Sequence, residues 1–345
     1  MTRARDPQPT LGRAAVGILM TGAVVSSRPI DDTLTVHRAW EIADLDGFLA
    51  ETGEQIRGIA ASGRMKIDEK LMARLPNLEI VANFGVGYDR IDVTQARARG
   101  IVVTNTPDVL TDEVADLTVG LMLATTRQMI LADRFVRSGR WPRGDFPLSD
   151  SLRNRVIGIV GLGRIGKAVA RRCAAMNVEV CYFGRSEQPD QPYRYLASLP
   201  ALAAAADVLI LTVPGAAGTD RLIDAAVLDA LGPEGILINV SRGSVVDEPA
   251  LLAALASGRI KAAGLDVFQN EPDVPRELIA MDNVVLLPHV GSGTVTTRRA
   301  MGQLVLDNLT SWFAGRGPLT PVPETPRRSA STMSDQSTSR LQNGV

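Results

Sequence analysis

The chain has 345 residues, of which 45% are hydrophobic and 22% charged, so it has the composition of a folded globular protein rather than a disordered one. Its 37 Lys and Arg residues nearly balance its 38 Asp and Glu residues, which argues against nucleic acid as the main partner. Two cysteines, Cys173 and Cys181, are too few for a secreted disulfide framework, and no apolar run approaches the roughly 20 residues that span a bilayer. We expect a soluble, cytoplasmic protein of roughly two domains.

The first part of the chain alternates short β-branched runs with helical stretches, which is typical of an α/β fold. The first run follows Arg3, Arg5 and Arg13, an order that also fits a signal peptide, but its likeness to the later runs favours a strand. Residues 111–139 then predict one long helix, with acidic residues in its opening turns, that could link two domains. The runs occupy residues 14–20, 34–40, 56–62, 78–84 and 101–105.

The second part of the chain contains near-continuous apolar runs, which predict a parallel sheet covered by helices on both faces. Residues 295–314 predict a last helix that ends before Gly315 and packs back on the first domain. The polar stretch 324–345 has no apolar periodicity, so we expect a disordered tail. The runs lie at residues 155–160, 178–183, 207–213, 235–240, 262–267 and 283–288.

A glycine-rich loop, Gly161-Leu162-Gly163-Arg164-Ile165-Gly166, lies between one of these runs and a helical stretch. In that context Gly161 permits a tight turn, Gly163 lets the backbone approach a pyrophosphate, and Gly166 lets helix and strand pack closely. The amides at the start of the helix favour negative charge. The loop therefore predicts a dinucleotide site, although an ordinary glycine turn is the alternative.

The next strand ends without the carboxylate that usually holds the ribose of NAD. Arg185 and Ser186 stand there instead and offer a guanidinium and a hydroxyl to a 2′-phosphate. The pattern favours NADP(H), with NAD(H) possible, because Glu187 would weaken the preference if it faced the ribose. A merely solvated Arg185 is the alternative.

Only two histidines occur, His37 and His289. His37 lies in a predicted strand without polar neighbours and is expected to be a packed or solvent-facing residue. His289 follows the run at 283–288, and Arg242 and Glu271 follow the runs at 235–240 and 262–267 in the same way. All three would lie at the carboxyl edge of the sheet, where open α/β folds bind ligands. Strand order decides whether they converge, and each alone is more often a surface residue or a loop anchor.

The chemistry of the three side chains is that of carbonyl reduction. Hydride transfer to a carbonyl leaves charge on oxygen, so a proton donor is needed, and His289 would supply the proton. Glu271 would hold the second ring nitrogen and favour the protonated imidazole. Arg242 would clamp a substrate carboxylate and polarise the adjacent carbonyl, which points to 2-oxo acids. No metal is expected.

With these residues in view, the chain resembles the D-isomer-specific 2-hydroxyacid dehydrogenase family, and within it the glyoxylate/hydroxypyruvate reductases and plant-type hydroxyphenylpyruvate reductases. The resemblance covers residues 16–322 and rests on TNTPDVLTDEVADL, GLGRIG, YFGRS, RGSVVDEP, AGLDVFQNEP and LLPHVGSGT. It implies two Rossmann-like domains with parallel sheets, in which an NADP-binding domain interrupts a discontinuous substrate domain. We expect the substrate domain at residues 13–105 and 291–323 and the nucleotide domain at residues 106–290.

The resemblance also implies roles for particular residues. The catalytic set would be Arg242, Glu271 and His289, and the amides of Val86 and Gly87 would bind the substrate carboxylate together with Arg242 and His289. The cofactor would be held by Gly161, Leu162, Gly163, Arg164, Ile165, Arg185, Ser186, the backbone of Val240, and Asp266. A homodimer is implied, with its interface at residues 117–146. Trp141 would either reach a neighbouring active site or anchor its own loop.

The leading hypothesis is NADPH-dependent reduction of glyoxylate, hydroxypyruvate or an aryl pyruvate to the D-2-hydroxy acid. The alternative is a dinucleotide-sensing, corepressor-like binding protein on the same scaffold, with a partner site in the tail; the intact set of Arg242, Glu271 and His289 speaks against it. Formate dehydrogenases carry an amide where Glu271 stands and are less favoured. Sugar-acid reduction and phosphite oxidation are minor options.

Overall fold

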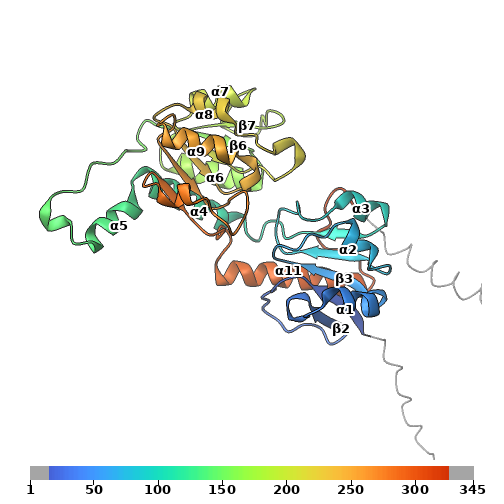
Figure 1. Cartoon of the computed structure of the whole chain (residues 1–345). Coiled ribbons are helices and arrows are strands. Elements are labelled where there is room, and N and C mark those ends of the chain that lie inside the picture. Colours follow the sequence, from blue (N-terminus) through green and yellow to red (C-terminus); the bar gives the residue numbers. More distant parts are fainter. Residues whose placement is uncertain (1–14, 326–345) are drawn as a thin grey trace, which may run out of the picture. The chain divides into compact units, whose positions relative to one another are not determined.

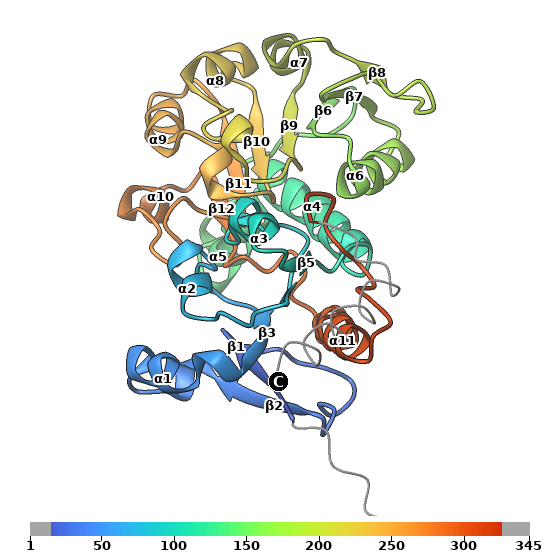
Figure 2. The ribbon, with the colours of Figure 1, turned by 90° about the vertical axis from the view of Figure 1, so that its right-hand side faces the viewer.

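The computed structural model describes residues 15–325 and divides into two compact units. Among the described residues, the first unit comprises residues 15–107 together with 298–325, and the second unit is Asp108–Thr297 (Figures 1 and 2). Each unit contains one parallel sheet flanked by helices, which confirms the predicted α/β class. The second unit is thus inserted into the first along the chain.

The sheet of the first unit has the order β2-β1-β3-β4-β5. All five predicted strands are present. β1 is hydrogen-bonded to a strand on each side, which confirms the predicted strand. The strands are β1 (Val16–Met20), β2 (Leu34–Arg38), β3 (Ile56–Ala61), β4 (Ile80–Asn83) and β5 (Val102–Thr104).

The last helix, α11 (Val295–Phe313), packs on this sheet as predicted. Gly58 of β3 lies so close that an added Cβ would meet side-chain atoms of Leu309 and Phe313, and the buried Trp312 donates its indole N–H to Glu79. The other helices of the unit are α1 (Leu45–Thr52), α2 (Glu69–Ala73) and α3 (Val93–Ala98). Although α11 has 19 residues, neither it nor any other helix in residues 15–325 could cross a membrane.

The segment after α11 corrects the predicted start of the tail. Thr325 is 4% exposed, and its hydroxyl lies within hydrogen-bonding distance of the Val103 carbonyl. Glu324 accepts a hydrogen bond from the hydroxyl of Tyr88. Both residues therefore belong to the folded first unit. Polar side-chain bonds hold them there, and such bonds leave no apolar periodicity in the sequence. The rest of the predicted tail lies outside the described residues.

The sheet of the second unit has the order β12-β11-β10-β9-β6-β7-β8. Asp and Ser side chains accept backbone amides at the starts of α7, α8 and α9, which is how short polar residues begin helices. The strands are β6 (Val156–Val160), β7 (Glu179–Phe183), β8 (Arg194–Tyr195), β9 (Val208–Leu211), β10 (Ile236–Asn239), β11 (Ala262–Leu265) and β12 (Val284–Leu286). The helices are α4 (Thr111–Thr126), α5 (Met129–Arg137), α6 (Arg164–Ala175), α7 (Leu199–Ala205), α8 (Ala225–Leu231), α9 (Glu248–Ala256) and α10 (Arg276–Ala280).

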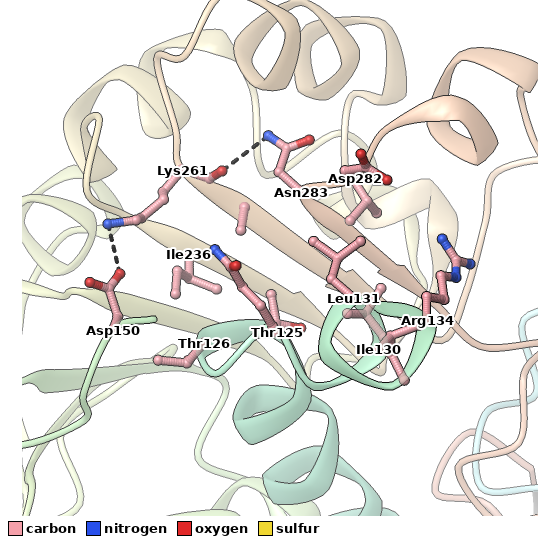
Figure 3. A pocket seen from close by; sticks show the side chains of 14 residues that line it. Thr125, Thr126, Ile130, Leu131, Arg134, Asp150, Ile236, Lys261, Asp282 and Asn283 are labelled. Carbon is pink, nitrogen blue, oxygen red and sulfur yellow. Dashed lines mark hydrogen bonds and ion pairs between the residues drawn. The ribbon is translucent and has the colours of Figure 1, made fainter. Parts of the chain in front are cut away.

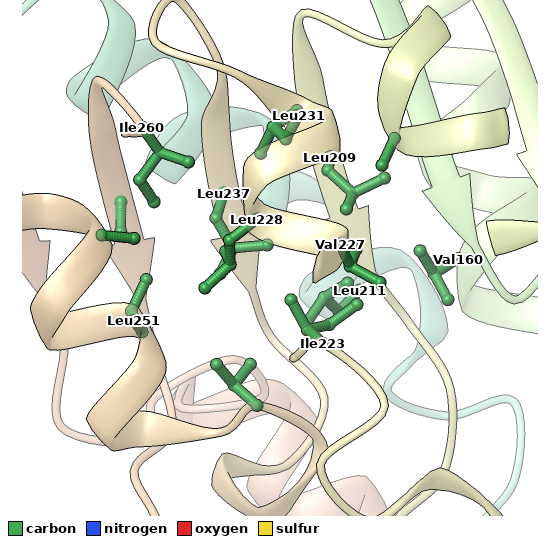
Figure 4. Packing of buried hydrophobic residues seen from close by; sticks show 14 of the residues in the cluster. Val160, Leu209, Leu211, Ile223, Val227, Leu228, Leu231, Leu237, Leu251 and Ile260 are labelled. Atoms are coloured by element: carbon green, nitrogen blue, oxygen red, sulfur yellow. The ribbon is translucent and has the colours of Figure 1, made fainter. Parts of the chain in front are cut away.

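Both faces of this second sheet are buried, as the continuous apolar runs predict. On one face Leu209 and Leu237 pack with Val227 and Leu228 of α8 and Leu251 of α9 (Figure 4). On the other face, the alternate residues of the same strands pack with α4 and α6. Because both faces of the sheet are packed, the carboxyl end of each strand has a defined position, and so does the start of the loop that follows it.

The single long helix predicted over residues 111–139 is wrong. It divides into α4 and α5 at Gln128, whose φ of 51° lies in the left-handed region. No glycine or proline marks this break, so no turn was predicted there. α4 packs on the second sheet, whereas α5 has no buried residue.

A cavity of about 60 Å³ lies between α5 and the amino ends of β10, β11 and β12 (Figure 3). Its wall includes Ile236, Ala262 and Val284, and Lys261 beside it pairs with Asp150 at 2.7 Å. Ile236, Ala262 and Val284 are the first residues of their strands, whereas the predicted catalytic residues come after the last residues of the same strands. The cavity is therefore separate from the predicted active site.

Candidate active site

Three adjacent strands bring the predicted catalytic residues to one edge of the second sheet. β10, β11 and β12 are neighbours, with Asn239 paired to Leu265 and Leu265 paired to Leu286. Their ends are therefore level, and the loops that carry Arg242, Glu271 and His289 leave from the same edge. The spacing of Arg242, Glu271 and His289 along the chain does not predict that their three strands are neighbours in the sheet.

Glu271 and His289 form a hydrogen-bonded pair. The Nδ1 atom of His289 lies 2.8 Å from Oε2 of Glu271, and the other carboxylate oxygen accepts the amide of Phe268 at 3.1 Å. The carboxylate side chain is 20% exposed and the imidazole 45% exposed. Because Glu271 occupies Nδ1, the Nε2 atom is the one that can reach a substrate.

The environment of Glu271 favours its charged form. Burial is the largest influence and opposes ionisation, but the His289 hydrogen bond and charge, the Phe268 amide and the charge of Arg242 together outweigh it. The pKa of Glu271 is consequently lowered from its ordinary value. The ionised carboxylate therefore remains a hydrogen-bond acceptor for Nδ1 of His289 and holds the ring in one orientation.

Asp266 fixes the loop that carries His289. Its two carboxylate oxygens accept the amides of Val290 and Gly291 at 2.7 and 2.8 Å. His289 itself has φ of 54°, a left-handed conformation that a non-glycine residue holds only when its surroundings impose it. Asp266 is 1% exposed, and this burial raises its pKa although both amide bonds act in the opposite direction. The resemblance implies that Asp266 holds the nicotinamide end, and the sequence did not reveal its bonds to the His289 loop.

Asn239, at the end of β10, shapes the turn that presents Arg242. Its amide donates to the Arg242 carbonyl at 3.0 Å, and its oxygen accepts from the amide and the hydroxyl of Ser241. Arg242 donates from its guanidinium to the Ser241 carbonyl and influences Glu271 electrostatically. Val240, whose backbone the resemblance assigns to the cofactor, lies in the same turn. The sequence analysis did not name Asn239. Its position at the end of a predicted strand was the one feature that could have indicated that it holds this turn.

The glycine-rich loop has the geometry that a dinucleotide requires. Gly166 lies so close to the Gly161 carbonyl that a Cβ there could not fit, whereas a Cβ at Gly163 would meet nothing within 4 Å. α6 begins at Arg164 without a side-chain cap, so its first amides remain available to an anion. Leu162 and Ile165 pack into the core beneath the loop, and the Arg164 guanidinium pairs with Asp108. These residues fit a bound pyrophosphate.

Arg185 and Ser186 follow β7 in an exposed turn. Within residues 15–325, the side chains of Arg185, Ser186 and Glu187 make no hydrogen bond or ion pair. A turn that presents an unpaired guanidinium and hydroxyl is suited to a phosphate ligand. Glu187 is equally exposed, so its carboxylate lies in the same turn without a cation of its own.

In the first unit, the loop that contains Val86 and Gly87 presents backbone donors. Side-chain amides occupy its carbonyls: Asn83 donates to Gly85 and Gly87 at 3.0 Å, and Asn105 donates to Val86 at 2.9 Å. No acceptor among the described residues meets the amides of Val86 and Gly87. The two asparagines, which the sequence analysis did not single out, leave these N–H groups available to an anion.

His37 lies in β2, and its ring centroid is 5.2 Å from that of Phe48. This contact agrees with the packed interpretation. His37 belongs to the first unit and His289 to the second. Of the two histidines, His289 alone has a carboxylate on its ring within the described residues.

Comparison with known proteins gives the context for this geometry. Residues 119–291 match the family model described as D-isomer specific 2-hydroxyacid dehydrogenase, NAD binding domain. A hydroxyphenylpyruvate reductase from Plectranthus scutellarioides is 46% identical over 310 residues, which cover 89% of this chain and 99% of that protein. The chain belongs to the D-isomer specific 2-hydroxyacid dehydrogenase family. It is therefore an NAD(P)-dependent oxidoreductase, as predicted.

Other members of the family show the range of named activities among relatives. A 2-ketogluconate reductase from Gluconobacter oxydans is 43% identical, over 86% of this chain and 95% of that protein. The crystal structure of an NADPH-dependent glyoxylate/hydroxypyruvate reductase from Sinorhizobium meliloti, in complex with NADP and malonate, is 50% identical, with a TM-score of 0.83. It covers 91% of this chain and 98% of that chain. Within this dehydrogenase family, the neighbours thus include reductases of both small and larger oxo acids.

Proposed function

We propose that this dehydrogenase reduces a small 2-oxo acid, of the glyoxylate, hydroxypyruvate or aryl pyruvate type, to the D-2-hydroxy acid, with NADPH as the preferred cofactor. The observation that carries the proposal is the 2.8 Å pair of Glu271 and His289 at the carboxyl edge of the second sheet. The named activities of the relatives support the same substrate class.

The residues of the chain divide the reaction between them. A bound nicotinamide dinucleotide supplies the hydride that adds to the carbonyl carbon. His289 donates the proton from Nε2 to the carbonyl oxygen, which becomes the hydroxyl of the product. Glu271 holds Nδ1, so that the ring keeps the orientation in which Nε2 faces the substrate.

Two groups recognise the acid itself. Arg242 binds the substrate carboxylate with its planar guanidinium and polarises the adjacent carbonyl. The Val86 and Gly87 amides serve as further carboxylate donors, since Asn83 and Asn105 occupy the loop carbonyls. This division explains why a 2-oxo acid, rather than a simple ketone, is the proposed substrate.

The preference for NADPH rests on Arg185 and Ser186. Their side chains are exposed and unpaired among the described residues, and no carboxylate ends β7 to hold ribose hydroxyls. The pyrophosphate is assigned to the amides of the Leu162–Ile165 loop, and the nicotinamide end to the Val240 backbone and Asp266. NAD(H) remains a secondary cofactor in this proposal because Glu187 adjoins the phosphate-binding pair.

A homodimer is proposed through residues 117–146. α5 has no buried residue in the single chain, and its large apolar side chains Met129, Ile130 and Val136 are exposed together with Trp141. A second copy would bury this apolar face. Sedimentation should show a dimer that dissociates in the I130D/V136D double variant, and a monomeric wild type would contradict the proposal.

A reducing, cytoplasmic location is proposed because Cys173 and Cys181 are both buried and form no disulfide with each other.

The test of the proposed function is a panel of 2-oxo acids assayed with NADPH and NADH in parallel. We expect the highest kcat/KM for a 2-oxo acid with NADPH, and no turnover of the corresponding aldehyde without a carboxylate. Equal rates on acids and aldehydes would contradict the role of Arg242. Equal kcat/KM with both cofactors would contradict the NADPH preference.

A further inference from the structure

The turn formed by residues 184–188 is anchored at both ends by tyrosines of the second sheet. The Tyr182 hydroxyl accepts the Gln188 amide at 2.7 Å, and the Tyr195 hydroxyl donates to the Gly184 carbonyl at 3.4 Å. The two rings also contact each other, with centroids 5.3 Å apart. Tyr182 is fully buried, so the ends of the turn are tied to a rigid strand while Arg185 and its neighbours remain exposed.

The Gln188 side chain joins this turn to the glycine-rich loop. Its Nε2 atom donates to the Leu162 carbonyl at 3.0 Å, and Leu162 is 3% exposed. One side chain therefore touches both structures that the proposed function assigns to the phosphates of the cofactor.

We propose that Gln188 is a positioning residue for cofactor selectivity. It fixes the separation between the pyrophosphate loop and the turn that carries Arg185 and Ser186, so that the guanidinium and hydroxyl stand where the 2′-phosphate arrives. This inference rests on the proposed preference for NADPH. NADH lacks the 2′-phosphate and does not use Arg185 in this way, so loss of the Gln188 bond should weaken NADPH binding selectively.

The test compares wild type with Gln188→Met, which keeps the length of the side chain and removes its donor. Calorimetry with 2′,5′-ADP and 5′-AMP measures the contribution of the 2′-phosphate without turnover. We expect about fivefold weaker binding of 2′,5′-ADP and little change for 5′-AMP, as for the loss of one hydrogen bond. In kinetics the loss should appear in KM for NADPH rather than in kcat, with KM for NADH nearly unchanged.

Tyr182→Phe, which removes the acceptor of the Gln188 amide, should reduce the same selectivity by a second route. Gln191→Met is the matched control, because the side-chain amide of Gln191 bonds only to its exposed neighbour Asp190 among the described residues. Equal weakening of both nucleotides, or of neither, by Gln188→Met would overturn the inference alone if the wild type prefers 2′,5′-ADP. A wild type that binds the two equally would overturn the proposed NADPH preference and the inference with it.

Discussion

The two functional regions of the second unit differ in how completely the protein prepares them. The proposed catalytic corner is formed by Asp266, Glu271 and His289. Each of these side chains has a hydrogen-bond partner within the chain, and the backbone of His289 is in the left-handed conformation. At the 184–188 turn, only the ends are held, and Arg185 and Ser186 have no partners among the described residues. The groups proposed to transfer a proton are thus held by other residues, whereas the groups proposed to bind a phosphate have no partner among the described residues.

The largest loss of activity is expected from replacement of His289. His289→Ala should lower kcat by about 10² to 10⁴-fold, because general acid catalysis is lost, while NADPH binding persists. Steady-state kinetics and fluorescence titration with NADPH measure the two properties separately. His37→Ala, the other histidine, is the control and should keep its rate. Near-normal turnover by His289→Ala would refute its role as proton donor.

Arg242→Lys keeps the charge at the catalytic edge but removes the planar fork. We expect kcat/KM for a 2-oxo acid to fall roughly 10²-fold, because one ammonium cannot bind a carboxylate in two-point fashion and polarise its carbonyl. The measurement is a kinetic comparison with Arg276→Lys, an exposed arginine of α10. If both lysine variants retain wild-type kcat/KM, the substrate lies elsewhere.

The lowered pKa of Glu271 predicts a pH dependence of stability. A carboxylate with a lowered folded-state pKa stabilises the protein fully above its unfolded value of about 4.3 and loses that contribution as pH falls through the folded value. Urea unfolding from about pH 6 to about pH 3 should therefore show a smaller acid-dependent loss in Glu271→Gln than in wild type. Glu51→Gln, at an exposed helix position, should follow wild type. An unchanged slope in Glu271→Gln would mean that the carboxylate gains nothing from its partners.

The smallest effect is expected at the 184–188 turn. Glu187→Ala removes a like charge beside the proposed phosphate site, and we expect NADPH to bind about twofold tighter at low salt, with the gain screened as salt is added. Titration with NADPH and NADH at two salt concentrations checks this. Weaker NADPH binding in the variant would show that Glu187 supports the turn instead of opposing the phosphate.

Much of the second sheet could be predicted because its strands are buried on both faces and appear as continuous apolar runs. The placement of Arg242, Glu271 and His289 after strand ends was visible, but the adjacency of β10, β11 and β12 was not, since spacing does not fix strand order. The break at Gln128 was missed because a left-handed glutamine carries no glycine signal.

Side chains that act on distant backbone were the least visible in the sequence. Asp266 holds amides beyond β12, and Gln188 reaches a carbonyl in the loop after β6. Such bonds form only because the fold brings two loops together. Neither Asp266 nor Gln188 lies in a sequence pattern that predicts its hydrogen bonds. Two-residue β8 is too short for any periodicity, and it carries the Tyr195 anchor.

Glu271 is proposed to act on the substrate only through His289. A double-mutant cycle on kcat tests it with His289→Ala, Glu271→Gln and the combined variant. Glu271→Gln alone should cost roughly 10 to 10²-fold, as for a hydrogen bond to a charged group, but should cost nothing further once His289 is absent. If the two losses multiply in the combined variant, Glu271 acts independently of the imidazole and the account is contradicted.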